Sequence, residues 1–200
     1  MKSVGKFILI FSVIVGVLLY ISSCHIKRNT IRIYSTNIQH APYDAIIVPG
    51  IPYDSVNPEF MMSVRMRWAK MLYEKGVTKN IIFSGSAVHS PFIEGRYMKI
   101  IADSLGIPSA HTFSEERALH STENITYGLE MANSLGFKKV AIATDPYQSI
   151  FLSSMYEKIN PSLPFLPLNV DSIPSFKILL PHINVNAAFV QNFIPIEKRK

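Results

Sequence analysis

A run of eighteen residues without a charge, from Phe7 to Cys24, most strongly constrains how this chain can fold. A helix needs about 20 apolar residues, at 1.5 Å each, to cross the hydrocarbon core of a bilayer, so the run is just long enough. Lys2 and Lys6 precede it. A helix buried in a soluble core would need apolar neighbours on every face, and nothing nearby in the sequence supplies them. We therefore expect residues 1–24 to be a signal or anchor segment.

The segment allows two forms of membrane attachment. It can remain as an uncleaved transmembrane helix, or it can be a signal that is removed before Cys24. Ile21-Ser22-Ser23-Cys24 resembles the lipobox of bacterial lipoproteins, in which the cysteine is lipidated and becomes the mature N-terminus. Three basic residues follow the run and two precede it, so the positive-inside rule does not decide the orientation. We expect the cell membrane as the location, with the soluble domain facing the periplasm or the outside.

The basic charge of the chain lies mostly at its ends. The net charge of +6 divides into +5 for residues 1–43, +2 for residues 197–200 and −1 for everything between them. A nearly neutral body lacks the clustered basic face that phosphate-backbone binding needs, so we expect a membrane partner and no nucleic acid. The composition, 48% hydrophobic and 17% charged, excludes a disordered chain, and a single cysteine excludes an internal disulfide framework.

The rest of the chain alternates between short apolar runs and helical patterns. Residues 25–43 are interpreted as a polar linker with a short strand at Ile31–Tyr34. Helix-length stretches separating short strands predict a parallel sheet covered on both faces, that is, a Rossmann-like doubly wound α/β domain over residues 44–170. Residues 171–200, rich in Pro and Asn, are an extension without a predicted place. We expect strands over 44–50, 80–85, 110–113, 139–144 and 165–170, and helices over 57–75, 93–105, 121–135 and 145–159.

Polar residues follow several of the predicted strands. Ligands of open parallel sheets bind outside the carboxyl ends of the strands, where glycines and helix N-termini favour an anion. The chain contains neither G-x-G-x-x-G nor G-x-x-x-x-G-K-[ST], so neither dinucleotide nor P-loop chemistry can be assigned, and the cofactor stays unknown. Its six histidines show no metal-ligand spacing such as H-E-x-x-H, so no metal site is expected.

A set of short motifs follows in order along the body of the chain. They are DAIIVPG at 44–50, Arg65 with Ala69, Leu72, Tyr73 and Gly76, IIFSG at 81–85, Glu94 with Met98, Gly106-Ile-Pro108, Glu115 with Ala118, Ser121, Glu123 and Asn124, and Thr144-Asp145-Pro146-Tyr147. Taken in this order, the motifs resemble the SanA/ElyC/YdcF-like family of bacterial proteins over roughly residues 44–155. The resemblance implies a Rossmann-like domain with one polar cleft and a role in the cell envelope, such as barrier function or peptidoglycan assembly. One YdcF member is reported to bind S-adenosylmethionine.

The same positions supply the candidate ligand-binding residues. We expect them around one depression at the carboxyl ends of the strands. Several carboxylates against one arginine would make that depression electronegative and would raise carboxyl pKa values. The sequence departs from the family pattern after the fourth predicted strand, residues 139–144. Gln148 stands there in place of a histidine, and Phe151 in place of an arginine. The candidates are Gly50, Arg65, Ser84, Gly85, Glu94, Glu115, Ser121, Glu123, Asn124, Thr144, Asp145 and Gln148.

Two classes of function remain open at this point. One is an enzyme or ligand-binding domain that acts on an anionic envelope metabolite or a nucleotide-like small molecule, S-adenosylmethionine included. The other is a non-catalytic envelope scaffold that binds a protein partner. Polar residues that converge on one pocket would favour the first class, and a large exposed apolar patch would favour the second. Whether the chain is an enzyme is left open.

Overall fold

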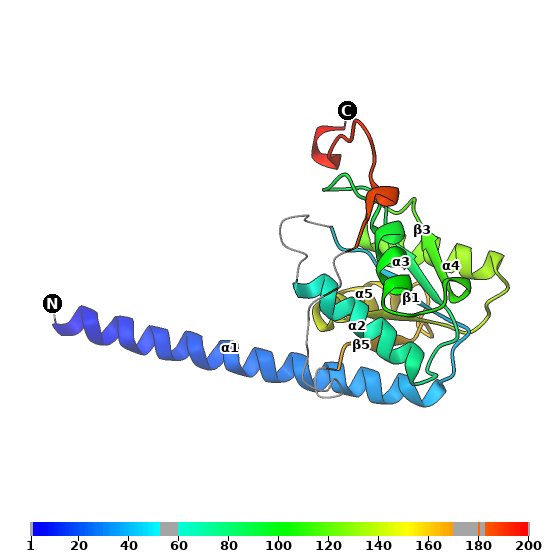
Figure 1. Cartoon of the computed structure of the whole chain (residues 1–200). Coiled ribbons are helices and arrows are strands. Elements are labelled where there is room, and N and C mark those ends of the chain that lie inside the picture. Colours follow the sequence, from blue (N-terminus) through cyan, green and yellow to red (C-terminus); the bar gives the residue numbers. More distant parts are fainter. Residues whose placement is uncertain (1, 53–59, 170–179, 181–182, 200) are drawn as a thin grey trace.

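The computed structural model describes residues 2–52, 60–169, 180 and 183–199, with side chains from residue 11 onward (Figure 1). The helix cap expected at Asn57 and Pro58 lies outside the described residues. The helices are α1 (Lys2–Asn37), α2 (Phe60–Glu74), α3 (Glu94–Ser104), α4 (Ser121–Ser134) and α5 (Pro146–Tyr156). The strands are β1 (Ala45–Pro49), β2 (Ile81–Ser84), β3 (Thr112–Glu115), β4 (Val140–Thr144) and β5 (Phe165–Pro167).

The five strands form one parallel sheet in the order β3-β2-β1-β4-β5. Successive side chains of a strand point to opposite faces, so the apolar run of β1 supplies two cores at once. Ile46 and Val48 join a cluster with α2 and α3, whereas Ala45 and Ile47 join a cluster with α4 and α5. Both faces of the sheet are therefore covered, and the predicted Rossmann-like doubly wound α/β fold is confirmed.

Most element boundaries agree with the sequence pattern to within a few residues. The largest differences among the strands are at β5, which ends at Pro167 rather than at residue 170, and at β3, which spans Thr112–Glu115 rather than 110–113 because Ser109–His111 forms a 3-10 turn first. Three helices stop before glycines with positive φ angles, which let the chain reverse without a Cβ clash. These glycines are Gly76 (φ +68°), Gly106 (φ +86°) and Gly136 (φ +80°).

The prediction of a polar linker with a strand at Ile31–Tyr34 is wrong, because α1 continues through this segment to Asn37. Its buried or half-buried positions recur at helical spacing: Ile26, Asn29, Thr30, Ile33, Tyr34 and Asn37. Tyr34 packs against Trp68 of α2, with ring centroids 5.5 Å apart, and Asn37 Nδ2 donates to the Phe165 carbonyl at 2.9 Å. This half of α1 thus covers β5, the strand whose outer edge would otherwise be unpaired.

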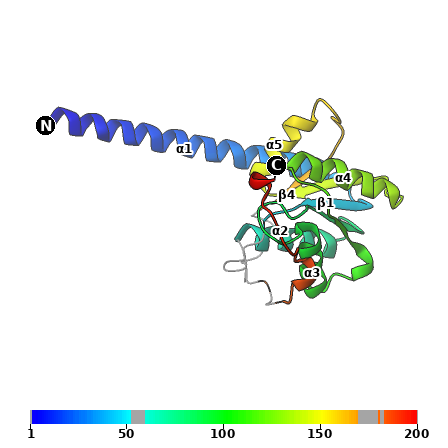
Figure 2. The same ribbon diagram turned by 90° about the horizontal axis from the view of Figure 1, so that it is seen from above.

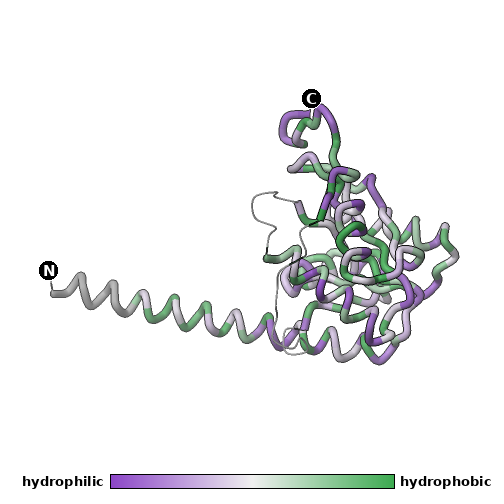
Figure 3. Tube along the Cα trace, in the orientation of Figure 1, coloured by the Kyte–Doolittle hydropathy of each residue, from purple (hydrophilic) through white to green (hydrophobic). Residues whose placement is uncertain are grey.

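In the first half of α1, the described side chains, from Phe11 to His25, are exposed. Figures 1 and 2 show this half projecting away from the body, and Figure 3 shows mostly hydrophobic colours over the turns that it does not draw in grey. The described stretch Phe11–His40 is long and apolar enough to cross a membrane, and none of its most apolar window is buried. A signal sequence near the N-terminus meets the same criteria. Membrane attachment through this helix, as an anchor or as a signal, therefore fits the structure, and Cys24 is a free, exposed cysteine on it.

The C-terminal extension, within its described part, packs against the loop that follows β2. The Ile93 N–H donates to the Ala188 carbonyl at 2.8 Å, and the Val190 N–H donates to the Pro91 carbonyl at 2.7 Å. A third backbone hydrogen bond joins the Ile196 N–H to the Val88 carbonyl at 3.1 Å. The extension therefore supports one wall of the sheet edge at which β1 and β2 end.

Candidate functional site

The candidate site lies at the switch point of the sheet, where the strand order reverses on either side of β1. β2 pairs with one side of β1 and β4 with the other, and such a switch point leaves a crevice beyond the carboxyl ends of the strands. A cleft of about 280 Å³ occupies this place. It is lined by Gly50, Ile51, Pro52, Arg65, Val88, His89, Glu94, Ala118, Leu119, His120, Ser121, Asn124 and Gln148.

Arg65 of α2 joins the two strands that border the switch point. Its Nη1 donates to the carbonyl of Pro49 at 2.8 Å and to that of Gly50 at 3.2 Å, and its Nη2 donates to the carboxylate of Asp145. The residue is 5% exposed, and burial lowers its pKa while Asp145 opposes that change. Arg65 therefore holds the ends of β1 and β4 together through its Nη groups, whereas its buried Nε has no hydrogen-bond partner among the described residues.

Glu94, the first residue of α3, is the buried acid that lines the cleft. It is 5% exposed, and no described residue donates a hydrogen bond to its carboxyl group. Burial raises its pKa from 4.5 to about 8, and the positive charge of Arg65 counteracts only part of that increase. Glu94 therefore keeps its proton at neutral pH, when it can donate a hydrogen bond into the cleft or act as a general acid.

Two glycines make room for this carboxyl group. A Cβ on Gly50 would lie 2.8 Å from the Glu94 Cβ and 2.9 Å from the Ser84 carbonyl oxygen, and it would overlap Glu94 Oε2. A Cβ on Gly85 would lie 2.7 Å from the same Oε2, and Gly85 has a φ of +154°. The ends of β1 and β2 can therefore approach Glu94 closely only because both positions lack a side chain.

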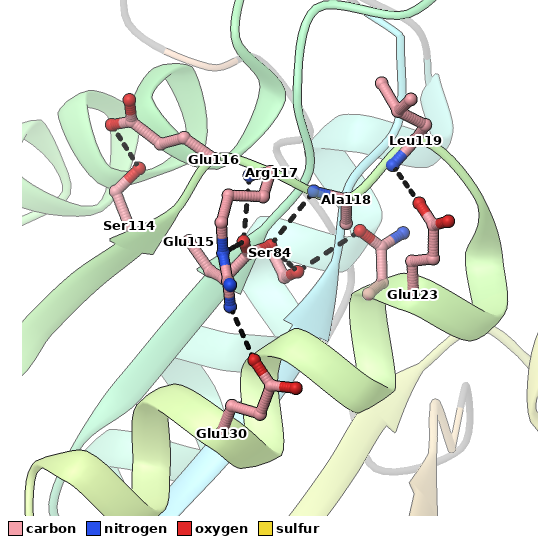
Figure 4. A network of polar contacts seen from close by, with 10 residues as sticks. Ser84, Ser114, Glu115, Glu116, Arg117, Ala118, Leu119, Glu123 and Glu130 are labelled. Atoms are coloured by element: carbon pink, nitrogen blue, oxygen red, sulfur yellow. Dashed lines mark hydrogen bonds and ion pairs between the residues drawn. The ribbon is translucent and has the colours of Figure 1, made fainter.

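A hydrogen-bond network behind the cleft shapes its second wall (Figure 4). Ser84 Oγ donates to Glu115 Oε2 at 2.7 Å and lies 3.2 Å from Asn124 Oδ1. The other oxygen of Glu115 accepts from the Arg117 backbone N–H at 2.8 Å, and Oε2 also lies 3.4 Å from the Ala118 N. Glu115 is 1% exposed, so its carboxylate shapes the loop carrying Ala118 rather than reaching a ligand.

The remaining expected residues lie along the same edge. Glu123 Oε2 accepts from the Leu119 N–H at 2.7 Å and thus closes the start of α4. Thr144 Oγ1 donates to the side chain of Gln148, which lines the cleft. Asp145 caps α5 by accepting from the Gln148 N–H at 2.9 Å.

The structure thus places the twelve expected residues in two sets. Those lining the cleft are Gly50, Arg65, Glu94, Ser121, Asn124 and Gln148. Those directly behind it or beside it are Ser84, Gly85, Glu115, Glu123, Thr144 and Asp145. The part of the lining that the structure describes is not the electronegative cleft that was expected. Among the described residues, Glu94 is the only carboxyl group in the lining, and the other three acids bond to groups of the protein.

Residues outside the twelve candidates also line the cleft. Two of them are His120, which precedes α4, and His89, which lies in the loop after β2 and whose Nδ1 pairs with Glu197 of the C-terminal extension. The position after a strand end would have pointed to His89, whereas the contact with Glu197 joins residues far apart in the sequence. The hydrophobic lining from Ile51, Val88 and Leu119 has no distinctive sequence signal.

A larger hollow of about 780 Å³ lies at the opposite edge of the sheet. It forms where α1 passes the amino ends of β4 and β5, and residues such as Asn37, Lys139 and Phe165 line it. The cleft is the better candidate because it contains a buried titratable group, whereas the hollow follows from the crossing of α1 over α5.

Fold and cleft together define a Rossmann-like α/β protein with a polar site at the switch point of its sheet and a helix fit for membrane attachment. Among the described residues, no three His, Cys, Asp or Glu side chains gather as a metal site would require. Comparison of the chain with protein-family models, curated proteins and solved structures finds no match.

Proposed function

We propose that this chain is a membrane-anchored protein of the bacterial cell envelope whose cleft binds a small anionic ligand. The envelope context comes from the resemblance to the SanA/ElyC/YdcF-like family, with the body in the periplasm or outside and a role in barrier function or peptidoglycan assembly. The choice of an anionic ligand rests on the chemistry of the cleft itself.

The observation that carries the proposal is the buried carboxyl group of Glu94, which lines the cleft without a hydrogen-bond donor among the described residues. Burial raises its pKa and so favours its protonated form. Burying a carboxyl group without a hydrogen-bond partner costs free energy, which a ligand oxygen that accepts its proton can recover. An acceptor with negative charge is favoured over a neutral one, since hydrogen bonds to charged groups are stronger. The arrangement resembles the oxyanion sites in which a neutral carboxylic acid serves as a donor.

The start of α4 adds donors beside Glu94. Its N-cap residue, His120, makes no side-chain cap hydrogen bond, whereas Asp145 caps α5 and the first turn of α3 bonds to the carbonyl of Gly85. An uncapped helix start leaves backbone N–H groups for an anion, and the helix dipole favours negative charge there. Ser121 and Asn124 of this first turn line the cleft.

The size of the cleft favours a small ligand or a single head group. Its 280 Å³, as bounded by the described residues, lies just below the range of about 300–1,000 Å³ that is usual for small-molecule sites. A dinucleotide would need more space, and the glycine-rich fingerprint for one is absent from the sequence. S-adenosylmethionine stays an alternative that the same binding experiment can include.

Sulfate is a suitable first probe because it keeps its charge across the pH range in which Glu94 titrates. With the full chain in lipid nanodiscs, sulfate should raise the unfolding midpoint at pH 6 to 7 and lose this effect above the Glu94 pKa of about 8. Glu94→Gln should keep the effect at every pH, because an amide also donates but does not titrate. Glu94→Ala should lose the effect throughout.

An exposed acid just after α5 provides the matched control. Glu157→Gln removes a carboxyl group outside the cleft and should leave both the sulfate effect and its pH dependence unchanged. If sulfate stabilises Glu94→Ala as much as the unmodified chain, or stabilises none of the proteins, the proposal fails. If instead the sulfate effect depends on Glu94 as expected, mass spectrometry of small molecules that copurify with the full chain would identify the natural ligand.

A second candidate function, a scaffold for a protein partner, is favoured by exposed apolar side chains on α5. Phe151 is 57% exposed and Met155, one turn later, is 41% exposed. If the chain is such a scaffold, cross-linking should recover a protein partner with the unmodified chain and lose it with Phe151→Ser. Glu94→Ala would leave the same cross-link in place.

A further inference from the structure

The distance of the body from the membrane follows from α1, because this helix is continuous from the apolar run into the body. Residues 2–37 form one helix, and Thr30 is the first buried residue among its described side chains. Thr30 lies six positions after Cys24, the end of the apolar run, which is about 9 Å along a helix axis. A head-group layer is roughly 5–8 Å thick, so the body begins where the lipid head groups end.

The end of the sheet that faces the membrane is its carboxyl end. Ser23, Ile26, Lys27 and Thr30 share a groove of about 310 Å³ with the start of α5 and the residues just after β5, namely Pro146, Tyr147, Leu168 and Asn169. Later residues of α1, such as Asn37, lie instead beside Lys139 and Phe165, at the amino ends of β4 and β5. α1 therefore runs opposite to the strands, and their carboxyl ends point toward the bilayer.

The cleft lies on this membrane-facing end. Gln148 lines the cleft, and the preceding residue, Tyr147, lines the groove with Ser23. The first turn of α5 therefore places the cleft at the same level along α1 as the end of its apolar run. Tyr147 is 69% exposed, and tyrosine is enriched at membrane interfaces. The same height holds whether the anchor is an uncleaved helix or a lipid on Cys24, because either one brings residue 24 to the membrane surface.

We infer that the cleft opens at the membrane surface and receives the anionic head group of an amphiphile whose apolar tail stays in the bilayer. The inference rests on the proposed function, since it names the class of ligand for the same cleft. A head group fits a cleft of 280 Å³, and the remainder of such a ligand needs no protein pocket. Arg28, exposed at the start of this region, adds positive charge where anionic head groups lie.

The first test measures the position of the cleft relative to the bilayer. The only tryptophan of the chain, Trp68, is fully buried, so a second tryptophan can report on one chosen site. In phosphatidylcholine nanodiscs that contain a head-group-level spin-labelled lipid, Tyr147→Trp should be quenched beyond the signal of the unmodified chain. Ile159→Trp, equally exposed but beyond the far end of α5, should not be. Equal quenching of the two variants, or none in Tyr147→Trp, would overturn the inference.

The second test compares two ligands that share a phosphate head. Methyl phosphate remains in solution, whereas hexadecyl phosphate partitions into the nanodisc and presents its head at the surface. The unfolding midpoint of the full chain should respond to hexadecyl phosphate at a bulk concentration about tenfold or more below that of methyl phosphate, because the tail concentrates it in the bilayer. Glu94→Ala should lose the response to both ligands.

The outcomes separate the two hypotheses. If the two phosphates act at the same concentration and both depend on Glu94, the cleft binds anions but is not served from the membrane, and the inference fails alone. If neither phosphate acts on the full chain, the proposed function and the inference fail together. A response to hexadecyl phosphate that persists in Glu94→Ala would be an effect of the lipid on the bilayer and would also overturn the inference.

Discussion

Replacement of Glu94 by glutamine should remove a pH dependence of folding stability that this single carboxyl group imposes. In the unfolded chain the group has its usual pKa of 4.5, and in the folded protein burial raises the pKa to about 8. Between these values the folded state holds one more proton than the unfolded state, so the free energy of unfolding falls as the pH rises. The contribution of Glu94 is fully present below pH 4.5 and is lost as the pH rises to about 8.

The magnitude follows from the size of this pKa difference. Stability changes by about 1.4 kcal/mol per pH unit while the two states differ by one proton, or roughly 5 kcal/mol over the whole interval. Whole domains are stable by only about 5–15 kcal/mol, so the effect is large enough to measure directly. Glutamine has nearly the same shape and no titration, and Glu94→Gln should therefore gain stability over the unmodified protein steadily as the pH rises.

Urea unfolding followed by the fluorescence of Trp68 can measure this effect between pH 4.5 and about 8. A chain that begins at Asn29 avoids the membrane segment while it keeps the packing residues Thr30 and Tyr34. Glu157→Gln, which removes an exposed acid, should run parallel to the unmodified protein. Parallel pH profiles for Glu94→Gln and the unmodified protein would refute the claim that Glu94 is buried in its protonated form.

Three further changes test other parts of the structure. Gly50→Ala should lower the free energy of unfolding by about 1–3 kcal/mol, because its Cβ would lie 2.9 Å from the Ser84 carbonyl; a fully stable variant in urea unfolding would contradict this packing. A chain that begins at Asn29 should unfold cooperatively by circular dichroism, whereas one that begins at Asp44 loses the cover of β5 and should aggregate on size-exclusion chromatography; identical behaviour would show that α1 does not support the body. Cys24→Ala should abolish acyl labelling if the chain is a lipoprotein and leave a membrane-bound, uncleaved protein if it is not; the unmodified full chain in the soluble fraction would exclude both.

The segment 25–43, predicted to be a linker, shows where local sequence patterns fail to predict the structure. The short β-branched run Ile31–Tyr34 predicted a strand, but the structure continues α1 through it. A helical period was present in Ile26, Thr30, Ile33 and Tyr34, yet nothing in the sequence shows what this face would contact. Its partners, Trp68 and Phe165, come from α2 and β5, and these tertiary contacts decided between the two patterns.

The candidate site divides in a similar way. The strand–helix alternation was sufficient to predict that residues from five segments meet at one edge, because parallel strands all end on the same side. The direction of each side chain was not predictable. Arg65, Glu115 and Asp145 carry charges that suggested ligand contacts, but they are bonded within the protein. Gly50 and Gly85 leave space for the carboxyl group of Glu94, and within the described part of the chain no donor reaches it.

The sequence by itself determined the apolar N-terminal run, the alternation of strands and helices, and hence the doubly wound parallel sheet. These features depend on hydrophobic periodicity and on turn residues, which act over a few neighbouring positions. Only the tertiary structure decided that α1 covers the β5 edge, that α1 runs opposite to the strands, and that Glu94 is buried in the cleft, where burial raises its pKa. Those outcomes depend on burial and on contacts between residues distant in the chain, which alone determine the solvent exposure and the partners of each group.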